Sequence, residues 1–306
     1  MKRPLFSCVI PVKGERPYFD EALESLMSQG MGDDLEIIVQ DADEIGVEGS
    51  GMGWDCFSRK GRKDLKGNGK GEEGGGSAQD YRGQDGEIAV EGIRWYREED
   101  KGQSDALNKG FKKARGEWLF WLNADDVLLA GAMKSLELKV KSLKFKDVEW
   151  IAGDTVYLDQ DGIARDVRTD AKWYPWLGKK LSVWTGGPSS FFRRELWERY
   201  GGFNEDLKYV MDIDLWTRWA KKGVKFTSVG RYVWGFRMHN GSKTMGGRNE
   251  KSHYEERVAV LKSHRLFNQQ GWRNLTRICS LFDGGWFKRL RDRKKFFGIN
   301  WRDLKI

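Results

Sequence analysis

The sequence predicts an α/β fold with a mostly parallel central sheet flanked by helices. Apolar runs of strand length occur at residues 5–12 and 35–39, and residues 17–29 between them carry apolar side chains at helical spacing. A strand, a helix and a second strand joined by short connections form a βαβ unit, which requires a parallel sheet. Acidic residues follow the ends of these strands, at the edge where ligands bind in open α/β sheets. We therefore expect a binding site at this edge.

The composition excludes several classes of protein. The chain has 306 residues and a net charge of +8, and it contains no run of 18 apolar residues, so no transmembrane helix is expected. The N-terminal apolar stretch is interrupted by Pro11 and Lys13, unlike a secretory signal. Cys8, Cys56 and Cys279 are too widely spaced to indicate a disulfide framework or a zinc site. We expect a cytoplasmic protein whose basic charge favours phosphorylated substrates, anionic lipid surfaces or nucleic acid.

The alternation of strands and helices continues through the middle of the chain. Residues 93–96 predict a strand, and residues 105–114 predict a helix with Gly116 as its C-cap. The apolar run at 118–122 predicts a buried strand, followed by an amphipathic helix at 130–143. The later elements expected are strands at 150–158, 189–192, 225–229 and 233–238, a hairpin turn at 159–162, and helices at 194–200 and 211–222.

Residues 46–90 interrupt this pattern. They contain 13 glycines and 15 charged residues but few apolar ones, whereas average usage would give about three glycines. Such a segment cannot bury enough apolar surface to offset the entropy lost on ordering. We expect a flexible glycine-rich insertion, either as surface decoration or as a mobile lid.

The stretch WLNADDV, residues 121–127, joins the end of a buried strand to adjacent carboxylates. Burying two neighbouring carboxylates without partners would cost several kcal/mol. A strand that delivers Asp125 and Asp126 to a cleft avoids this cost, because Mg²⁺ or Mn²⁺ binds carboxylate oxygens together with substrate phosphates. The alternative interpretation is an Asx-rich turn that caps the next helix.

Five fragments of the sequence carry a family resemblance. They are FSCVIPVKG, LEIIVQDADE, EDKGQSDALNKGFKKARGEWLFWLNADDV, GGPSSFFRRELWERYGGFNEDLKYVMDIDLW and FRMHNGSKT. Each fragment is a weak signal by itself, but in this order they resemble the inverting family 2 glycosyltransferases with the GT-A fold. The resemblance covers residues 5–45 and 91–245, and it implies a Rossmann-like GT-A catalytic domain over residues 1–264.

The resemblance implies a nucleotide-sugar donor bound with Mn²⁺ or Mg²⁺. The family's Asp-x-Asp metal motif corresponds to Asn123, Ala124 and Asp125, with Asn where the first Asp usually stands. Asp125 is therefore the expected metal ligand, and Asn123 offers a carbonyl oxygen or a ribose hydrogen bond. His239 matches a loop histidine that completes the metal site or contacts the diphosphate in many relatives. Imidazole is an acceptable ligand for Mn²⁺, although a single histidine is often structural.

Further donor contacts are implied by the same resemblance. Asp41 stands where the family has a carboxylate that hydrogen-bonds the nucleobase, with Asp43 as the alternative, and either is otherwise a turn residue at a strand end. The family pattern DxGxxDAxNxG opens a helix whose N-terminus suits phosphate or ribose binding or ordinary N-capping. The remaining donor-site residues expected are Pro11, Asp100, Gly102, Asp105, Asn108 and Gly187. Residues 186–190 are expected to line the sugar or acceptor pocket, and residues 242–244 to close over the phosphates.

Inverting transfer is a single displacement that needs one general base to deprotonate the acceptor hydroxyl. The family supplies this base at the start of a helix, commonly from Glu-Asp, and Met211 and Asp212 occupy that position. Asp212 is the expected base, the alternative being an N-cap. Asp214 points elsewhere on the same helix and is expected to cap it or to pair with Arg218.

Residues 265–306 lie outside the resemblance and form a basic, aromatic extension. The end of this segment mixes Trp, Phe and Leu with Arg and Lys. This composition is typical of a peripheral contact with an anionic membrane, which would suit a lipid-linked acceptor and the inner membrane face. Packing on the catalytic domain and nucleic-acid binding through phosphates are the alternatives.

The sequence therefore predicts a metal-dependent inverting glycosyltransferase. Its donor is expected to be a nucleotide sugar, with UDP favoured over GDP, and its acceptor a hydroxyl of a glycan or glycolipid in polysaccharide assembly. A non-catalytic nucleotide-sugar or glycan-binding protein on the same fold is the main alternative, favoured by the missing first Asp of the metal motif and the missing Glu before Asp212. A basic nucleic-acid-binding protein is less consistent, because the carboxylates would repel phosphates unless a metal is bound.

Overall fold

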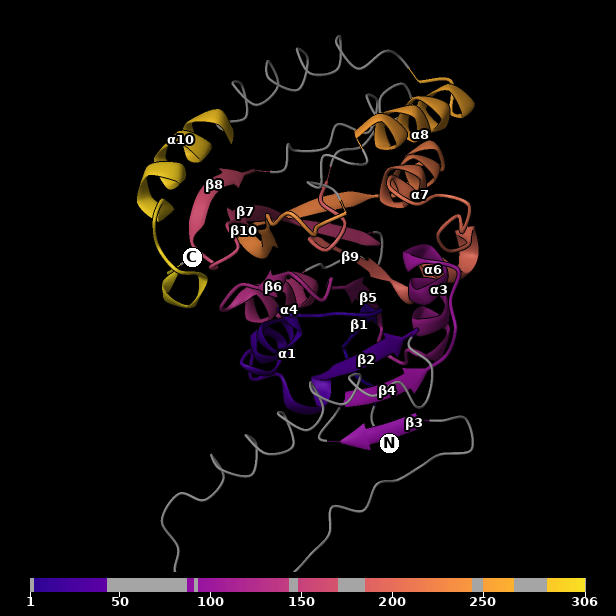
Figure 1. Ribbon diagram of the computed structural model, residues 1–306, viewed down its shortest axis with the longest axis horizontal. Coiled ribbons are helices and arrows are strands. Elements are labelled where there is room, and N and C mark those ends of the chain that lie inside the picture. Colours follow the sequence, from indigo (N-terminus) through magenta and orange to yellow (C-terminus); the bar gives the residue numbers. More distant parts are fainter. Residues whose placement is uncertain are drawn as a thin grey trace, which may run out of the picture.

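The computed structural model shown in Figure 1 describes residues 3–42, 87–90, 93–142, 148–169, 185–243, 250–266 and 285–305. Within these ranges the chain forms one sheet of ten strands with helices on both of its faces. No helix in the described ranges is long and apolar enough to cross a membrane. The expected α/β fold is confirmed.

The predicted elements occur in the predicted order, and further strands at 87–90 and 127–128 and helices at 250–263 and 285–296 were not predicted. The strands are β1 (Phe6–Val12), β2 (Leu35–Asp41), β3 (Glu87–Val90), β4 (Ile93–Arg97), β5 (Trp118–Trp121), β6 (Val127–Leu128), β7 (Trp150–Leu158), β8 (Ala164–Arg168), β9 (Ser190–Arg193) and β10 (Phe226–Arg237). The helices are α1 (Phe19–Met27), α3 (Gln103–Lys113), α4 (Ala132–Ser142), α6 (Arg194–Tyr200), α7 (Met211–Lys221), α8 (Glu250–Ser263) and α10 (Gly285–Phe296), with short 3₁₀ turns η1 (Gly32–Asp34) and η3 (Trp301–Asp303).

The sheet has a parallel half and a mixed half. Its strand order is β3-β4-β2-β1-β5-β9-β7-β10-β6, with β8 paired to β7 outside this path. Neighbours from β4 through β2 and β1 to β5 are parallel, and so are β7 and β10. The remaining pairs are antiparallel. The prediction of a mostly parallel sheet therefore describes the first half of the chain and not the second.

The central strand β1 explains why helices cover both faces. Phe6, Cys8 and Ile10 belong to the core under α1 and α4, whereas Val9 points to the opposite core, under α3 and α7. Because side chains alternate along a strand, a strand covered on both faces must be apolar at nearly every position. The second core is built around stacked indoles, with the ring centroids of Trp150 and Trp216 4.8 Å apart.

Two predicted elements differ from the structure. The prediction of a flexible insertion was wrong for its last four residues, which form β3 antiparallel to β4, while residues 46–86 lie outside the described part of the chain. The strands predicted at 225–229 and 233–238 are one strand, β10, whose pairing with β7 is irregular between Ser228 and Trp234. Gly230, at φ +71°, lies in this irregular stretch. The glycine and polar residues of this stretch are typical of a turn, yet the chain continues along the same neighbouring strand, β7.

The C-terminal residues pack on the domain. Phe296, Trp301 and Leu304 are buried in a core that they share with the β7–β8 hairpin. The backbone N–H of Ala164 donates to the carbonyl oxygen of Ile299 at 2.9 Å. For residues 285–305, the packing interpretation of the basic extension is therefore confirmed.

Candidate active site

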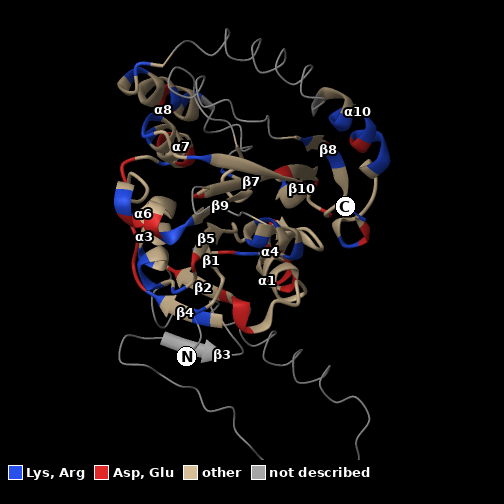
Figure 2. Cartoon of the chain, turned by 180° about the vertical axis from the view of Figure 1, so that it is seen from behind, with Lys and Arg blue, Asp and Glu red and all other residues tan. Residues whose placement is uncertain are grey.

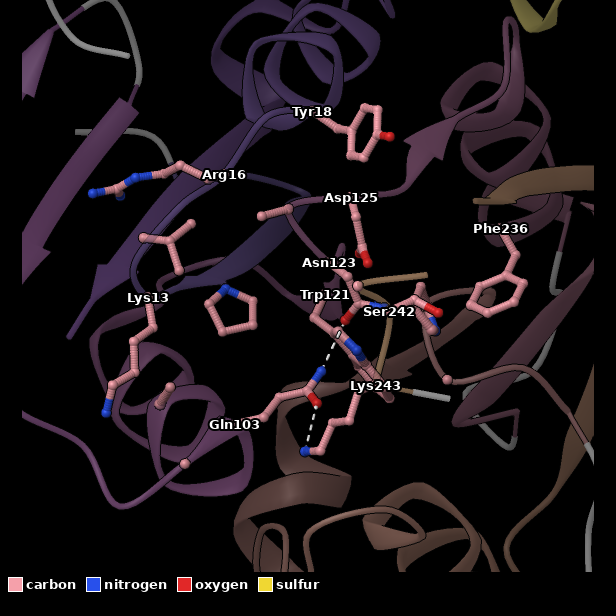
Figure 3. Close-up of a pocket in the computed structure, with 18 of the residues that line it drawn as sticks. Lys13, Arg16, Tyr18, Gln103, Trp121, Asn123, Asp125, Phe236, Ser242 and Lys243 are labelled. Atoms are coloured by element: carbon pink, nitrogen blue, oxygen red, sulfur yellow. Dashed lines mark hydrogen bonds between the residues drawn. The ribbon is translucent and has the colours of Figure 1, made fainter. Parts of the chain in front are cut away.

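A cavity of about 440 Å³ opens at the carboxyl ends of β1 and β5. This volume lies in the range of small-molecule sites. Its walls come from the loop after β1, the start of α3, the end of β5, the start of α7, the end of β10 and the loop after β10. Figure 3 shows side chains from these segments converging on one space, with Lys13 and Arg16 on one side and Phe236 on the other. The expected site at the edge of the parallel half is therefore present as a cavity.

Asp125 and His239 meet in this cavity. Asp125 Oδ2 lies 3.0 Å from His239 Nε2, and the ring of Tyr18 packs against the imidazole with 5.1 Å between centroids. The main chain at Asp125 is fixed from behind by Arg237, whose buried side chain donates from Nε to the Asp125 carbonyl at 3.0 Å. One carboxylate oxygen and one imidazole nitrogen, 114 residues apart in sequence, thus face each other at the cavity wall.

Asn123 is held by two hydrogen bonds. Its amide nitrogen donates to Asp126 Oδ2 at 2.7 Å, and its side-chain oxygen accepts from Gln103 Nε2 at 2.8 Å. Figure 3 shows that Gln103 also faces Lys243, whose Nζ lies 3.5 Å from Gln103 Oε1. An Asp at position 123 would place a second carboxylate oxygen against Asp126. The amide nitrogen of Asn123 instead donates a hydrogen bond to Asp126.

Asp126 has a structural role. It is fully buried, and its Oδ1 accepts the backbone N–H of Arg237 at 2.9 Å. Burial, followed by the charge of the neighbouring Asp125, raises the pKa of Asp126 well above the usual range of a carboxyl. Only one of the two adjacent carboxylates, Asp125, therefore faces the cavity.

Asp212 lies in the first turn of α7 at the cavity wall. Its Oδ1 accepts the backbone N–H of Ile213 at 2.8 Å. Burial raises the pKa of Asp212 to about 6, against the opposing influence of hydrogen bonds and of the Arg168 and Arg257 charges. A carboxylate with this pKa is ionised near neutral pH and accepts a proton more readily than an ordinary Asp, as a general base requires.

Gly187 makes room beside Asp212. A Cβ atom at this glycine would lie 2.4 Å from the ring of Trp121 and 3.3 Å from Asp212 Oδ2. Any larger residue would therefore displace the indole and intrude on the carboxylate. The absence of a side chain at position 187 keeps the space in front of Asp212 open.

Glu256 of α8 fixes the start of α7. Its carboxylate accepts the backbone N–H groups of Lys208, Tyr209 and Val210 at 2.9, 2.7 and 2.9 Å. These donors precede the helix that carries Asp212, and Figure 1 shows α8 lying along α7. Asp214 is turned toward the same helix and pairs with Arg218 at 2.9 Å, as predicted, and with His264 at 2.8 Å.

Asp41, the expected nucleobase contact, does not line the cavity. Its side chain is buried, and its Oδ2 accepts from Trp95 Nε1 at 3.0 Å and from Arg16 at 3.2 Å, with Arg97 Nε at 3.8 Å. Arg16 itself reaches the cavity wall. The carboxylate predicted to contact the nucleotide therefore acts, in this structure, on a cation that does line the site.

The start of α3 divides the predicted donor-binding residues. Asp100 and Gly102 line the cavity, and Gly102 adopts φ +136°, a conformation that favours glycine. Asp105 instead accepts the backbone N–H of Lys101 at 2.9 Å, and Asn108 bonds the backbone of Phe203. These two residues hold the helix start and the loop before α7, and neither belongs to the cavity wall.

Known proteins share this architecture. The family model described as glycosyl transferase family 2 matches residues 80–176. Uncharacterized glycosyltransferases of Rickettsia felis and Rickettsia typhi are 25% and 22% identical to this chain, over 81% and 82% of it. This chain is therefore similar to glycosyltransferase family 2. It spans 37% of the length of the R. felis protein and 70% of the R. typhi protein.

Solved structures with the GT-A fold are similar to this chain over most of its length. The mannosyltransferase PcManGT from Pyrobaculum calidifontis, in complex with GDP-Man and Mn²⁺, matches with a TM-score of 0.52 and 18% identity over 86% of this chain and 63% of that one. S. aureus TarS 1–349 in complex with UDP-GlcNAc matches with a TM-score of 0.54 and 15% identity, over 83% and 65%. At these identities the similarity establishes the fold alone.

Twelve of the predicted site residues line the cavity. They are Pro11, Asp100, Gly102, Asn123, Ala124, Asp125, Gly187, Pro188, Asp212, His239, Ser242 and Lys243. Asp43 and Thr244 lie outside the described residues. The matched family segment ends at residue 176, so only the fold brings Asp212 and His239 to the segment that contains Asp125.

Several cavity residues were not predicted from the sequence. Arg16 and Tyr18 follow β1, Gln103 opens α3, and Lys208 and Tyr209 precede α7. Each lies within a few residues of a predicted position, so adjacency to a strand end or helix start was the available signal. Arg, Tyr, Gln and Lys are common on protein surfaces, so their presence at these positions does not by itself indicate a site.

Proposed function

We propose that this protein transfers a sugar from a nucleotide-activated donor to an acceptor hydroxyl, with inversion at the anomeric carbon. The observation that carries this proposal is the meeting of the Asp125–His239 pair with Asp212 in one cavity of about 440 Å³. A charge-stabilising group and a proton acceptor are the two functions that a single displacement requires.

Asp212 is the proposed general base. Its carboxylate takes the proton of the acceptor hydroxyl while the acceptor oxygen bonds to the anomeric carbon. The bond from that carbon to the diphosphate oxygen breaks in the same displacement, and the nucleoside diphosphate leaves. The pKa of about 6 supports this role, and the space that Gly187 leaves beside the carboxylate supports access by the acceptor.

A divalent cation fits the other wall. Among the described residues there is no cluster of three or more His, Cys, Asp or Glu side chains of metal-site geometry. Asp125 and His239 supply two ligands, however, and Mg²⁺ and Mn²⁺ are commonly held by one or two protein ligands together with substrate phosphates. When bound, Mn²⁺ or Mg²⁺ would neutralise the charge that develops on the diphosphate. Lys243 and Ser242, also on this wall, are proposed to contact the phosphates.

UDP is the proposed donor nucleotide, with GDP as the alternative. TarS was solved with UDP and UDP-GlcNAc, and PcManGT with GDP-Man. The acceptor class proposed is a glycan or glycolipid. Arg16 and Lys13, at the far side of the cavity from Phe236, are proposed to lie near the nucleotide.

A thermal-shift panel tests the proposal. UDP, GDP, dTDP and CMP are each added with and without Mn²⁺ to wild type, to Asp125→Ala and to the exposed control Asp161→Asn. A nucleotide at about 100 times its dissociation constant stabilises the folded state by about 2.7 kcal/mol. We expect one nucleotide to stabilise wild type and the control only when Mn²⁺ is present, and to leave Asp125→Ala unchanged.

Two outcomes contradict the proposal. Stabilisation of Asp125→Ala equal to that of wild type would remove Asp125 from the metal site. Stabilisation of wild type without turnover of the matching nucleotide sugar, across glycan and glycolipid acceptors, would favour a non-catalytic binding protein on the same fold.

A further inference from the structure

Helix α10 presents different chemistry on its two faces. On the inner face, Phe296 is 3% exposed and Asp292 is 5% exposed. Asp292 accepts a hydrogen bond from the Tyr232 hydroxyl at 3.0 Å, and Lys288 pairs with Asp154. This face holds the helix against β8 and β10, so the rest of its surface points away from the domain (Figure 1).

The outer face of α10 is apolar. Trp286, Phe287, Leu290 and Phe297 are 43%, 64%, 41% and 57% exposed, and they make up four of the seven exposed large hydrophobic side chains among the described residues. The N–H of Phe297 donates to Arg293 at 3.0 Å, so the helical path reaches this residue. At 3.6 residues per turn, the four side chains fall within a stripe about 100° wide.

Basic residues flank this stripe, and Lys294 lies within it. Arg289, Arg291, Arg293, Lys294 and Lys295 are exposed, and Figure 2 shows Lys and Arg positions in blue along α10. Asp166 contacts Arg289 and Arg293, and Asp292 contacts Arg291. Because these carboxylates are fewer than the cations, the helix surface keeps a net positive charge.

We propose that the outer face of α10, defined by Trp286, Phe287, Leu290 and Phe297 with its flanking Lys and Arg, docks on an anionic phospholipid bilayer. An apolar stripe between cationic side chains matches the acyl and phosphate layers at a bilayer surface. A second copy of the chain fits poorly, since the same face would oppose its own positive charge. Nucleic acid would satisfy the cations but would offer Leu290 no apolar partner.

Vesicle co-sedimentation with the full chain tests this docking. We expect binding to vesicles of phosphatidylcholine with about one quarter phosphatidylglycerol, little binding to pure phosphatidylcholine, and release at high salt because surface charges are then screened. The triple variant Trp286→Ser, Phe287→Ser, Leu290→Ser should reduce the partition coefficient at least about tenfold. Lys294→Gln with Lys295→Gln should reduce it by a similar factor.

The matched control is Leu138→Ser on α4, which removes an equally exposed apolar side chain, 58% exposed, from a different helix. It should bind as wild type does, and every variant should keep the wild-type melting temperature within about 2 °C. Absence of binding to anionic vesicles, equal binding to both vesicle types, or unchanged binding by the triple variant would overturn the proposal. The proposal would also be overturned if wild type bound single-stranded RNA tightly but did not bind vesicles, and if Lys294→Gln with Lys295→Gln abolished the RNA binding. Vesicle binding needs no donor, so this result is independent of transfer activity.

Discussion

Asp41 and Asp212 are both carboxylates at the site end of the fold, but their surroundings differ in kind. Asp41 is fully buried between two guanidinium groups and an indole N–H, within 3.0 to 3.8 Å. Asp212 lies at the cavity wall, where burial raises its pKa to about 6 and arginines act only at longer range. One environment stabilises the charged carboxylate, whereas the other makes the charge costly.

This contrast separates a structural carboxylate from a reactive one. A carboxylate that is paired with partly buried cations, as Asp41 is with Arg16 and Arg97, holds those side chains in place. One that is poorly compensated takes up a proton readily, and catalytic groups are often of this second kind. Asp126 and Asp125 differ in another way, because Asp126 is buried and hydrogen-bonded to Asn123 and Arg237, whereas Asp125 faces the cavity beside His239.

The largest expected effect is on turnover. Asp212→Asn should lower kcat by about 10² to 10⁴-fold, because the amide cannot accept the acceptor's proton, while the dissociation constant for the donor nucleotide stays within a factor of about three. Initial rates and calorimetric titration measure the two quantities. Asp206→Asn, an exposed change in the preceding loop, is the control. If Asp212→Asn kept more than a tenth of the wild-type kcat, Asp212 would not be the base.

The next effect concerns stability and has opposite signs at the two carboxylates. Asp41→Asn should lower the free energy of unfolding by about 2 kcal/mol at pH 7, because Arg16 and Arg97 lose a buried anion. Asp212→Asn should raise it by about 2 kcal/mol, because it removes a charge that the folded state disfavours. Urea unfolding at pH 7 measures both.

The sign of the second change depends on pH. The folded state holds the Asp212 proton up to about pH 6, whereas the unfolded chain releases it near pH 3.9. The charge of Asp212 therefore costs stability progressively as pH rises from about 4 to 6, and the full cost is present at pH 7. The gain from Asp212→Asn should vanish at pH 4. A destabilised Asp212→Asn at pH 7 would mean that its charge is well compensated, and the contrast with Asp41 would fail.

A pH profile examines the same carboxylate in the working enzyme. The kcat/KM of wild type should fall about tenfold per pH unit below about pH 6 and level off above it, because the base must be ionised. The profile is measured from pH 4.5 to 8 at constant ionic strength with saturating Mn²⁺. An acid limb near pH 4 would assign the base to an ordinary, solvated carboxylate instead.

The smallest expected effect concerns the influence of α8 on the pKa of Asp212. Glu256→Gln removes a negative charge from the N-terminus of α7, so the positive end of the helix acts more strongly on Asp212. The acid limb should move about half a pH unit lower, with a few-fold loss of kcat because the base is weaker. Glu255→Gln, an exposed neighbour on the same helix, should leave the profile unchanged. A shift to higher pH would contradict this electrostatic role.

Local sequence patterns predicted much of the fold. Strand β7 and helix α6 begin and end at the predicted residues, and most other elements differ by one to three residues. Buried strands require continuous apolar runs and helices require a 3.6-residue repeat, and both signals are local. β3 was missed because four residues at the end of a glycine-rich segment carry too short a pattern. Strand β10 was predicted as two strands because Gly230 is a residue typical of turns.

The residues of the candidate site were predicted less accurately than the strands and helices. Adjacency to strand ends and helix starts identified Asp125 and Asp212, since such positions meet at one edge of an α/β sheet. It also suggested Asp41, Asp105 and Asn108, which occupy similar positions in sequence but point into the protein, where backbone or cationic partners hold them. Position along the chain does not reveal whether a carboxylate or amide side chain faces the cavity or forms hydrogen bonds inside the protein.

Local patterns along the chain were enough to predict the alternation of strands and helices, the resemblance to family 2 glycosyltransferases, and a short list of carboxylates near the site. Which of these carboxylates face the cavity depends on contacts that form only in the folded chain. The partners that neutralise Asp41 come from the loop after β1 and from β4, and the partner that orders Asp126 comes from β10, 111 residues away. A carboxylate's charge state depends on such distant groups, and folding alone brings them within a few ångströms.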